Sequence, residues 1–354
     1  MTQGFLTCVR IMAATAAVAV MAAAPAGAAD ITLTETGSTL LQPLFDIVVP
    51  DYLKTHSGVQ IRTAATDSEA GQKQALSGQV LIGASDAYMS DAQVRANPNF
   101  LNIPVAISAQ AIVYNLPGLN TPNLRLDGPT IAGIYTGAVR QWDAPAIAVL
   151  NPGVALPHQA IVPVHRADGS GDNFVFTQFL TFSTPSWESS KGYGTSVEWP
   201  KVQDAIGVEG NAAMVKSLQT TPGSIGYVGI SYSNDIAAAK LGIALLKNEA
   251  GQFVLPARDA IVAGAASLGA RTPPDERLTL VYGPGDQSYP LVNYEYVVVS
   301  TQQASPEVAA ALRRFLSWLI VPSEENADYL DRVHFVPLPP HTWELSHAQI
   351  QLIR

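Results

Sequence analysis

Short β-branched and apolar runs alternate with amphipathic stretches in the first part of this chain. Residues 31–37 (ITLTETG), 59–65 (VQIRTAA) and 80–86 (VLIGASD) have the character of strands, and residues 40–56 and 68–78 between them have helical spacing. Strands separated by helices of this length predict an α/β fold with a largely parallel sheet.

Two unusually long extended runs lie far apart in the sequence, at residues 103–118 and 289–300. Two such strands could carry the chain from one lobe to the other and back again. We therefore expect one lobe from residues 30–115 plus 289–354 and a second from 116–288. Ligand sites favour the cleft between such lobes. A single large domain with a long insertion is the alternative.

The N-terminal 29 residues have the pattern of a secretory signal peptide. Arg10 precedes an Ala-rich apolar run, and Ala26-Gly27-Ala28 fits the A-x-A rule, so we expect cleavage near Ala28 or Ala29. A membrane anchor is the alternative, but the run is shorter than the roughly 20 residues that a span needs. Cys8 precedes the apolar run, so it cannot serve as a lipid-anchor cysteine. The sequence predicts a periplasmic protein.

Composition narrows the classes of function. The 354 residues carry a net charge of −9, which becomes −10 once the signal peptide is removed, and this argues against a nucleic-acid surface. Cys8 is the only cysteine, so the mature chain has no disulfide and no thiolate chemistry. The six histidines form no H-E-x-x-H or other zinc pattern, and we expect no metal and no cofactor.

Three segments share one local design, in which a strand ends, small or hydroxyl residues follow, and a helix begins. They are residues 37–40 (GSTL), 67–71 (DSEAG) and 168–172 (DGSGD). The first N–H groups of a helix have no partner within the helix and attract anions. The three segments together predict an anion site, although each could also be an ordinary helix cap.

Two charged residues sharpen that prediction. Arg166 precedes the third segment, where its guanidinium could hold two oxyanion oxygens, and Asp168 could orient it. A surface ion pair is the alternative. Asp86 ends the strand at 80–86, where its carboxylate could accept a hydrogen bond from protonated phosphate but would repel sulfate. A helix cap is the alternative for Asp86.

Four motifs carry a resemblance to a known family. GASDAYMS, LDGPTIAGIYTGAVRQWDAPAIAVLNPGVALP, HRADGSGDNFVFTQFL and TPGSIGYVGISY occur in this order and resemble the periplasmic phosphate-binding proteins of the phosphate-specific ABC transporters, the PstS family. The resemblance implies a two-lobed class II periplasmic-binding-protein fold that binds phosphate without catalysis. It implies inorganic phosphate and a membrane ABC permease with its cytoplasmic ATPase as partners. We expect a monomer that does not bind nucleic acid.

Motif by motif, the resemblance implies which residues bind phosphate. The expected ligand-binding residues are Thr39, Leu40, Ser68, Asp86, Arg166, Ser170, Gly171 and Asp172, with Asp168 as the partner of the arginine. Three departures stand out. Asp67 and Glu69 flank Ser68 where the family has a Gly-rich loop, Leu40 replaces an aromatic residue, and Asp172 stands where the family often has threonine.

Other functions remain as alternatives. Gly83-Ala84-Ser85-Asp86-Ala87 nearly matches the nucleophile elbow of hydrolases, so Ser85 could attack a phosphate ester with His165 as base. A non-transporting phosphate scavenger or scaffold is the third possibility. A scaffold predicts no stabilisation by phosphate.

Overall fold

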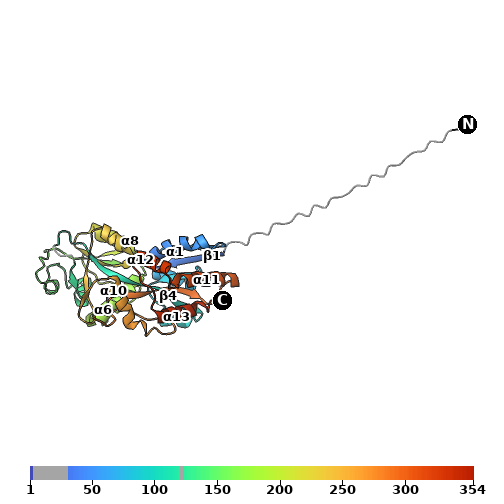
Figure 1. Cartoon of the computed structure of the whole chain (residues 1–354). Coiled ribbons are helices and arrows are strands. Elements are labelled where there is room, and N and C mark those ends of the chain that lie inside the picture. The colour runs from blue at the N-terminus through green and yellow to red at the C-terminus, as the bar shows by residue number, and fades with distance from the viewer. Residues whose placement is uncertain (3–30, 120–122) are drawn as a thin grey trace.

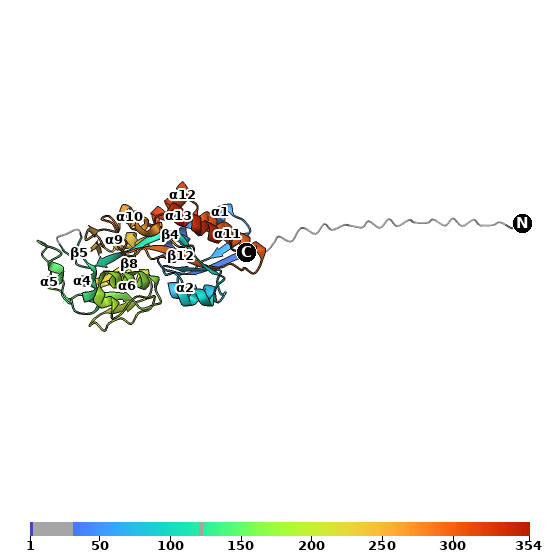
Figure 2. The same ribbon diagram turned by 90° about the horizontal axis from the view of Figure 1, so that it is seen from below.

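The computed structural model describes residues 1–2, 31–119 and 123–354, and Figures 1 and 2 show two groups of elements joined by long strands. Apart from its first two residues, the predicted signal peptide with its cleavage site lies outside these ranges. Within these ranges, no helix has both the length and the apolar character of a membrane span.

The first lobe begins with the predicted alternation of strands and helices. β1 (Ile31–Gly37) pairs in parallel with β2 (Val59–Arg62) on one side and β3 (Ile82–Ser85) on the other, with α1 (Gln42–Thr55) and α2 (Ser68–Leu76) as connections. The predicted elements are therefore confirmed to within a few residues at each end.

Two long strands lead from one lobe to the other. β4 (Phe100–Tyr114) leads out of the first lobe and β12 (Val292–Ser300) leads back, so the two pair antiparallel along their length. β12 also pairs antiparallel with β3, and β4 pairs antiparallel with β8 (Ser224–Gly229). The prediction of a largely parallel sheet is thus wrong for its centre, because neighbouring crossover strands that connect the lobes in opposite directions must run antiparallel.

The second lobe extends the same sheet. β6 (Val162–Arg166) pairs in parallel with both β8 and β7 (Ile206–Val208), which gives the strand order β2-β1-β3-β12-β4-β8-β6-β7. α6 (Gly171–Ser183) follows β6 and is buried on all sides over its first three turns. Contacts on all sides therefore hold its N-terminus in place.

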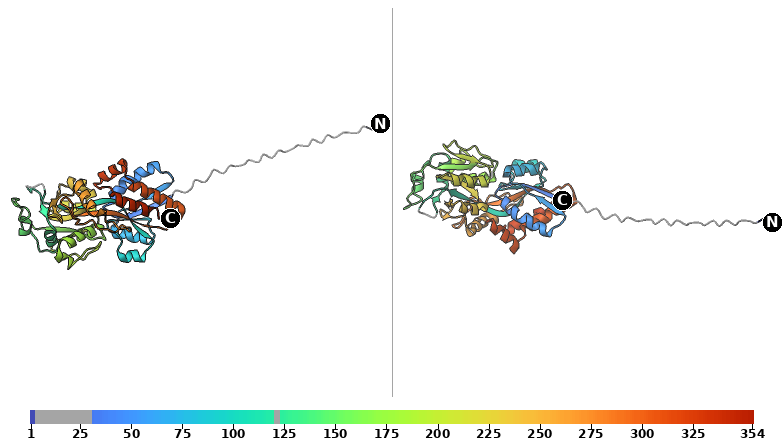
Figure 3. Two further views of the ribbon diagram at one scale, coloured as in Figure 1. Left: turned by 60° about the horizontal axis from the view of Figure 1, so that its bottom comes forward. Right: turned by 90° about the horizontal axis from the view of Figure 1, so that it is seen from above.

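The remaining elements cover the two ends of the sheet. Between β3 and β4 lies α3 (Asp91–Ala96), and after β12 follow α11 (Pro306–Ile320), α12 (Glu324–Arg332) and α13 (Pro340–Ile350). The segment between β4 and β12 also holds β5 (Arg125–Leu126), α4 (Gly128–Tyr135), α5 (Pro145–Ala148), α7 (Pro185–Glu188), α8 (Asn211–Thr220), η1 (Ile230–Tyr232), α9 (Ser233–Ala238), β9 (Gly242–Ile243), β10 (Leu245–Lys247), β11 (Phe253–Val254) and α10 (Arg258–Gly269). Figure 3 shows that the blue N-terminal and red C-terminal parts share one lobe.

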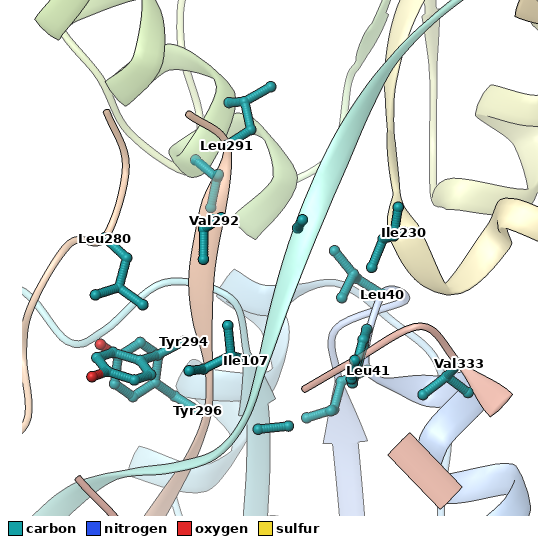
Figure 4. Close-up of a cluster of buried hydrophobic side chains, with 14 of the residues drawn as sticks. Leu40, Leu41, Ile107, Ile230, Leu280, Leu291, Val292, Tyr294, Tyr296 and Val333 are labelled. Carbon is teal, nitrogen blue, oxygen red and sulfur yellow. The ribbon is translucent and has the colours of Figure 1, made fainter. Parts of the chain in front are cut away.

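The hydrophobic core runs from one lobe into the other. Leu40, in the turn after β1, lies beside Ile230, which follows β8 (Figure 4). A Cβ atom added at Gly229 would lie 2.6 Å from Leu40 Cγ, so the two lobes are in direct contact here. This packing fixes the turn after β1 against the second lobe.

The start of α2 packs directly on the sheet at Gly71. A Cβ atom there would lie 2.6 Å from the carbonyl oxygen of Ala84 and 2.7 Å from Gly37 Cα. Both are backbone atoms, so no side-chain rotation could relieve the contact. Gly71 therefore sets the depth at which α2, and with it Ser68, lies against the ends of β1 and β3.

Gly71→Ala should destabilise the protein by a net ~1–2 kcal/mol, because overpacking outweighs the better helix propensity of alanine. Chemical denaturation measures the change. Lys73→Ala, at an exposed position of the same helix, is the control and should change stability by less than about 0.5 kcal/mol. A Gly71→Ala variant as stable as the original chain would contradict the close packing.

Candidate functional site

The residues singled out from the sequence lie together where the two lobes face each other. Each lies at or just after the carboxyl end of β1, β3 or β6, at the start of α6, or, for Ser68, at the start of the helix that follows β2. They are Thr39 and Leu40 after β1, Ser68 at the start of α2, Asp86 after β3, Arg166 at the end of β6, and Asp168, Ser170, Gly171 and Asp172 in the loop and first turn of α6. Ligands of open α/β folds bind at such strand ends.

Asp86 is the centre of the first lobe's part of this site. Its side chain is 1% exposed, and its Oδ1 accepts a hydrogen bond from the Ser38 hydroxyl. The Ser68 hydroxyl donates to Asp86 Oδ2 at 3.4 Å and accepts from the Asp86 N–H at 3.2 Å. Asn293 Nδ2 donates to the Asp86 carbonyl oxygen. Asp86 is therefore held from several sides rather than capping the next helix.

Arg166 provides the positive charge of the second lobe's part. Its Nε donates to Asp168 Oδ1 at 2.7 Å and its Nη2 donates to Asp168 Oδ2, while Nη1 donates to Asp172 Oδ2. The guanidinium is 1% exposed, so the surface ion pair considered from the sequence is excluded. Burial opposes its charge, but the hydrogen bonds and charges of the two aspartates outweigh burial and raise the pKa of Arg166.

The N-terminus of α6 brings the two parts of the site together. Ser170 is its N-cap and accepts the Asp172 N–H at 3.0 Å. A Cβ atom added at Gly171 would lie 2.5 Å from Asp86 Oδ2 and 2.5 Å from Ser68 Oγ. Only glycine allows this approach, and the helix N-terminus of one lobe thus touches the carboxylate of the other.

The turn after β1 is bound by the second lobe as well. Thr39 Oγ1 accepts hydrogen bonds from the backbone N–H and the side-chain amide of Asn211, at 3.2 and 3.1 Å, and from Arg166 Nη1 at 3.4 Å. Tyr232 OH donates to the Thr39 carbonyl oxygen. The Leu40 N–H donates to Ser38 Oγ at 3.1 Å, so this expected ligand donor has an internal partner here.

The acidic residues beside Ser68 have roles away from the anion site. Asp67 caps α2 by accepting the Ala70 N–H at 2.7 Å. Glu69 reaches the second lobe, where its Oε2 accepts from Thr195 at 3.2 Å and Ser196 at 2.9 Å, and its N–H donates to the Gly169 carbonyl oxygen. Glu69 therefore connects the lobes across the rim of the site.

Sequence reasoning missed several polar residues of the site. Ser108 and Gln110 on β4 and Asn293 and Glu295 on β12 lie in the middle of the crossover strands and are all buried. The sequence pattern could have identified these four residues. Each pair consists of polar residues two positions apart in an otherwise apolar run, which places both side chains on one face of the strand. Ser38 belongs to the predicted segment 37–40 but was not among the expected ligand-binding residues. Asn211, at the start of α8, was missed and gives no comparable signal.

Glu295 lies beside Asp86 at an irregularity of β12. The strand register shifts between Glu295 and Tyr296, opposite Pro104, which has no N–H to donate to the ladder. Ser108 donates to Glu295 Oε1, and the Glu295 carboxyl group also hydrogen-bonds the Asp86 side chain. Burial and then the charge of Asp86 raise the pKa of Glu295 well above its ordinary value, which favours the protonated form that can donate to Asp86.

The proposed hydrolase pair does not form. The Ser85 hydroxyl donates to the Ala87 carbonyl oxygen at 2.7 Å and accepts from Gln72 Nε2 at 3.0 Å. The His165 ring lies against Trp199 and its Nδ1 faces the Arg166 carbonyl oxygen. Each residue thus has its own surroundings. In the described ranges no cluster of three or more histidine, cysteine, aspartate or glutamate residues is placed to hold a metal ion.

Known proteins resemble this chain over most of its length. Residues 22–324 match the family described as PBP superfamily domain. The phosphate-binding protein PstS of Pasteurella multocida (strain Pm70) is 33% identical and aligns over 90% of this chain and 89% of its own. The phosphate-binding protein PstS 3 of Mycobacterium leprae (strain TN) is 31% identical, over 87% of this chain and 83% of its own.

Solved structures show the same fold. A high-affinity periplasmic phosphate-binding protein solved with bound phosphate superposes with a TM-score of 0.71 at 21% identity, over 90% of this chain and 93% of that one. A phosphate-binding protein from Stenotrophomonas maltophilia gives 0.68 at 19% identity, with coverages of 90% and 93%. At these identities the likeness concerns the fold, which is the two-lobed periplasmic-binding-protein fold.

Glu295→Gln should make stability less dependent on pH. Native Glu295 keeps its proton above the pH at which the unfolded chain loses it, so its contribution to stability falls as pH rises above about 4.5, the ordinary value. Glutamine has no such proton. The melting temperature of the variant minus that of the original chain should therefore increase steadily from pH 5 to pH 8.

Thermal unfolding of unliganded protein across this range measures the difference. Glu344→Gln, at an exposed position of α13, is the control and should give parallel curves. Parallel curves for Glu295→Gln as well would show that Glu295 is ionised in the native state.

Proposed function

The chain belongs to the PBP superfamily and, within it, to the PstS family of phosphate-binding proteins, and on that premise we propose that it captures inorganic phosphate between its lobes and delivers it to an ABC permease. The main support for this proposal is the close contact of Gly171 with Asp86. It brings an arginine and a helix N-terminus of one lobe against a buried carboxylate of the other, which is a set of groups suited to a protonated oxyanion.

We propose that the donors of both lobes hold the phosphate oxygens. Arg166 supplies charge-assisted hydrogen bonds, and Asp168 fixes the plane of its guanidinium through two of its nitrogens. The N-terminus of α6, with Ser170 and Gly171, supplies N–H groups aligned with the helix dipole. Thr39, Leu40 and Ser68 complete the set from the first lobe.

Asp86 would select the ligand. A carboxylate accepts a hydrogen bond only from an anion that carries a proton, so monohydrogen and dihydrogen phosphate are accepted. Sulfate carries none at neutral pH, and two negative oxygens in a buried contact repel each other strongly. The burial of Asp86 strengthens this discrimination because water cannot screen the repulsion.

Closure of the lobes would retain the ligand. The site residues Ser68, Asp86, Arg166 and Asp172 are each 1% exposed, so phosphate could enter or leave only when the lobes separate. The contacts of Glu69 with Thr195 and Ser196 must break at that step. Hinged opening of this kind is typical of two-lobed binding proteins.

The remaining features of this function are expectations from the sequence. We propose that the protein acts in the periplasm as a monomer, after cleavage near Ala28 or Ala29, and does not bind nucleic acid. The lobe boundaries near residues 115 and 289 likewise remain part of the proposal. They agree with the direction in which β4 and β12 run between the lobes.

Asp86→Asn should reduce the discrimination between phosphate and sulfate. Contact between like charges costs several kcal/mol, so the original chain should prefer phosphate by about a hundredfold or more. An amide can donate to sulfate, and the ratio should fall by at least about tenfold. Titration calorimetry with both anions measures it. Asp259→Asn, on the exposed face of α10, should keep the original ratio, whereas an unchanged ratio in Asp86→Asn would exclude Asp86 as the selecting group.

Glu69→Ala should speed phosphate release. Loss of the two side-chain hydrogen bonds across the rim removes about 1 kcal/mol of closed-state stability, which corresponds to roughly fivefold faster dissociation. Association should change little, because the contacts form only on closing. Stopped-flow displacement measures both rates, and Glu69→Gln, which keeps an acceptor oxygen, should lie near the original chain. Slower association with unchanged release would contradict a role in retention.

A further inference from the structure

The anion site contains far more acid than base. Arg166 is its only cation among the described residues, whereas Asp86, Asp168, Asp172 and Glu295 place four carboxyl groups around it. Asp168 neutralises Arg166, and burial favours the protonated form of Glu295. Asp86 and Asp172 would leave the buried site with excess negative charge if both were ionised, and burial accordingly raises the pKa of each. An anion could enter such a site only together with protons.

Asp172 occupies the donors that an anion would use. Its Oδ2 accepts from Arg166 Nη1 and from Asn211 Nδ2 at 2.7 Å, and its Oδ1 accepts from Gln110 Nε2 at 3.0 Å. The residue is 1% exposed and follows Gly171, which touches Asp86. Two carboxylates therefore border the same small space, from opposite lobes.

Unpartnered polar atoms in the floor of the site point to a bound ligand. Gln110 Oε1 and Asn293 Oδ1 are buried without a hydrogen-bond partner among the described residues. Buried polar atoms are normally paired, so each of these two calls for a partner such as a bound ligand or water. Both belong to the crossover strands: the Gln110 amide donates to Asp172 Oδ1, and the Asn293 amide donates to the Asp86 carbonyl oxygen.

We propose that Asp172 makes this site bind phosphate with one more proton than Asp86 alone requires, shared between the Asp172 carboxyl and a phosphate oxygen. The inference rests on the proposed function and specifies the form of its ligand. Monohydrogen phosphate has a single proton, which Asp86 uses. Either the dihydrogen form enters, or monohydrogen phosphate enters with a proton on Asp172, and both routes give the same complex. No covalent bond other than O–H is made or broken.

The charges around Asp172 support this assignment. Burial raises the pKa of Asp172 to about 7, Arg166 on β6 opposes the shift, and Asp86 after β3 adds to it. Asp168 in the loop after β6 also raises it. Three further ionisable groups interact with it: Glu295 on β12 and the phenols of Tyr227 on β8 and Tyr232 on η1. Burial raises the pKa of all three, that of Tyr232 to about 12, and so favours their uncharged forms.

Calorimetry with inorganic phosphate tests the proposal directly. Titrations at pH 6–8.5, in buffers with different ionisation enthalpies, give both the affinity and the number of protons taken up. We expect the original chain to take up about one proton per phosphate at pH 8, and its Kd to weaken about tenfold per pH unit above pH 7.5. Near pH 7 the uptake should vanish, and below it binding should release protons and weaken again, because free dihydrogen phosphate and protonated Asp172 then carry one proton more than the complex retains.

Two substitutions identify the residue responsible. Asp172→Asn keeps the shape, and Asp172→Thr replaces the acid with a hydroxyl donor, which guards against a folding defect in either one. Both should lose the proton uptake at pH 8 and most of the slope of log Kd against pH, whatever their absolute affinity. Asp259→Asn, at an exposed position of α10 away from the site, is the control and should retain the uptake.

The outcomes separate the two proposals. Phosphate binding by the original chain without proton uptake at pH 8, or uptake that persists in both Asp172 variants, would overturn the role of Asp172 and leave phosphate binding standing. Absence of phosphate binding at every pH would overturn the proposed function and this inference with it.

Discussion

The contact between Gly171 and Asp86 is the constraint on which the rest of the site depends. It requires a residue without a side chain at the first position of α6, a carboxylate at the end of β3, and two lobes closed tightly enough to exclude water. Once water is excluded, each charge needs a partner, because unpaired buried charge is very costly. The neighbouring residues supply these partners: Ser38 and Ser68 donate hydrogen bonds to Asp86, and Asp168 neutralises Arg166.

The same requirement explains polar residues in the least expected place. β4 and β12 form the centre of the sheet, where burial on both faces favours apolar side chains. Ser108, Gln110, Asn293 and Glu295 interrupt both strands where the strands pass under the cleft. Burial of such polar groups is costly, and it raises the pKa of Glu295 well above its ordinary value. Natural proteins tolerate such local conflict mainly where a site requires it.

Much of this arrangement could be predicted from the sequence, for identifiable reasons. Strand and helix periodicities located β1 to β3 and both crossover strands, and glycine and hydroxyl residues marked the strand ends. The antiparallel centre was not predictable from local alternation, because the direction of β12 depends on the path of the chain through a whole lobe. Asn211 was missed for the same reason: it lies 172 residues from Thr39, to which it donates. From the sequence, Glu69 was expected near the anion because it adjoins Ser68. The sequence does not show the direction of its side chain, which bonds Thr195 and Ser196 instead.

Asp168 and Asp172 show how one arginine can serve two opposite purposes. Asp168 binds Nε and Nη2 side by side, as an acceptor with two oxygens in the plane of the guanidinium, and so orients it without covering Nη1. Asp172 binds Nη1 itself, the position that an incoming oxyanion needs. In the proposed phosphate site the first aspartate would prepare Arg166 for an anion, whereas the second would stand in for one. A carboxylate in the place of the ligand would have to move or be protonated when the ligand arrives. Because Asp172 is part of the buried first turn of α6, there is little room for movement, and this favours the protonation that we propose.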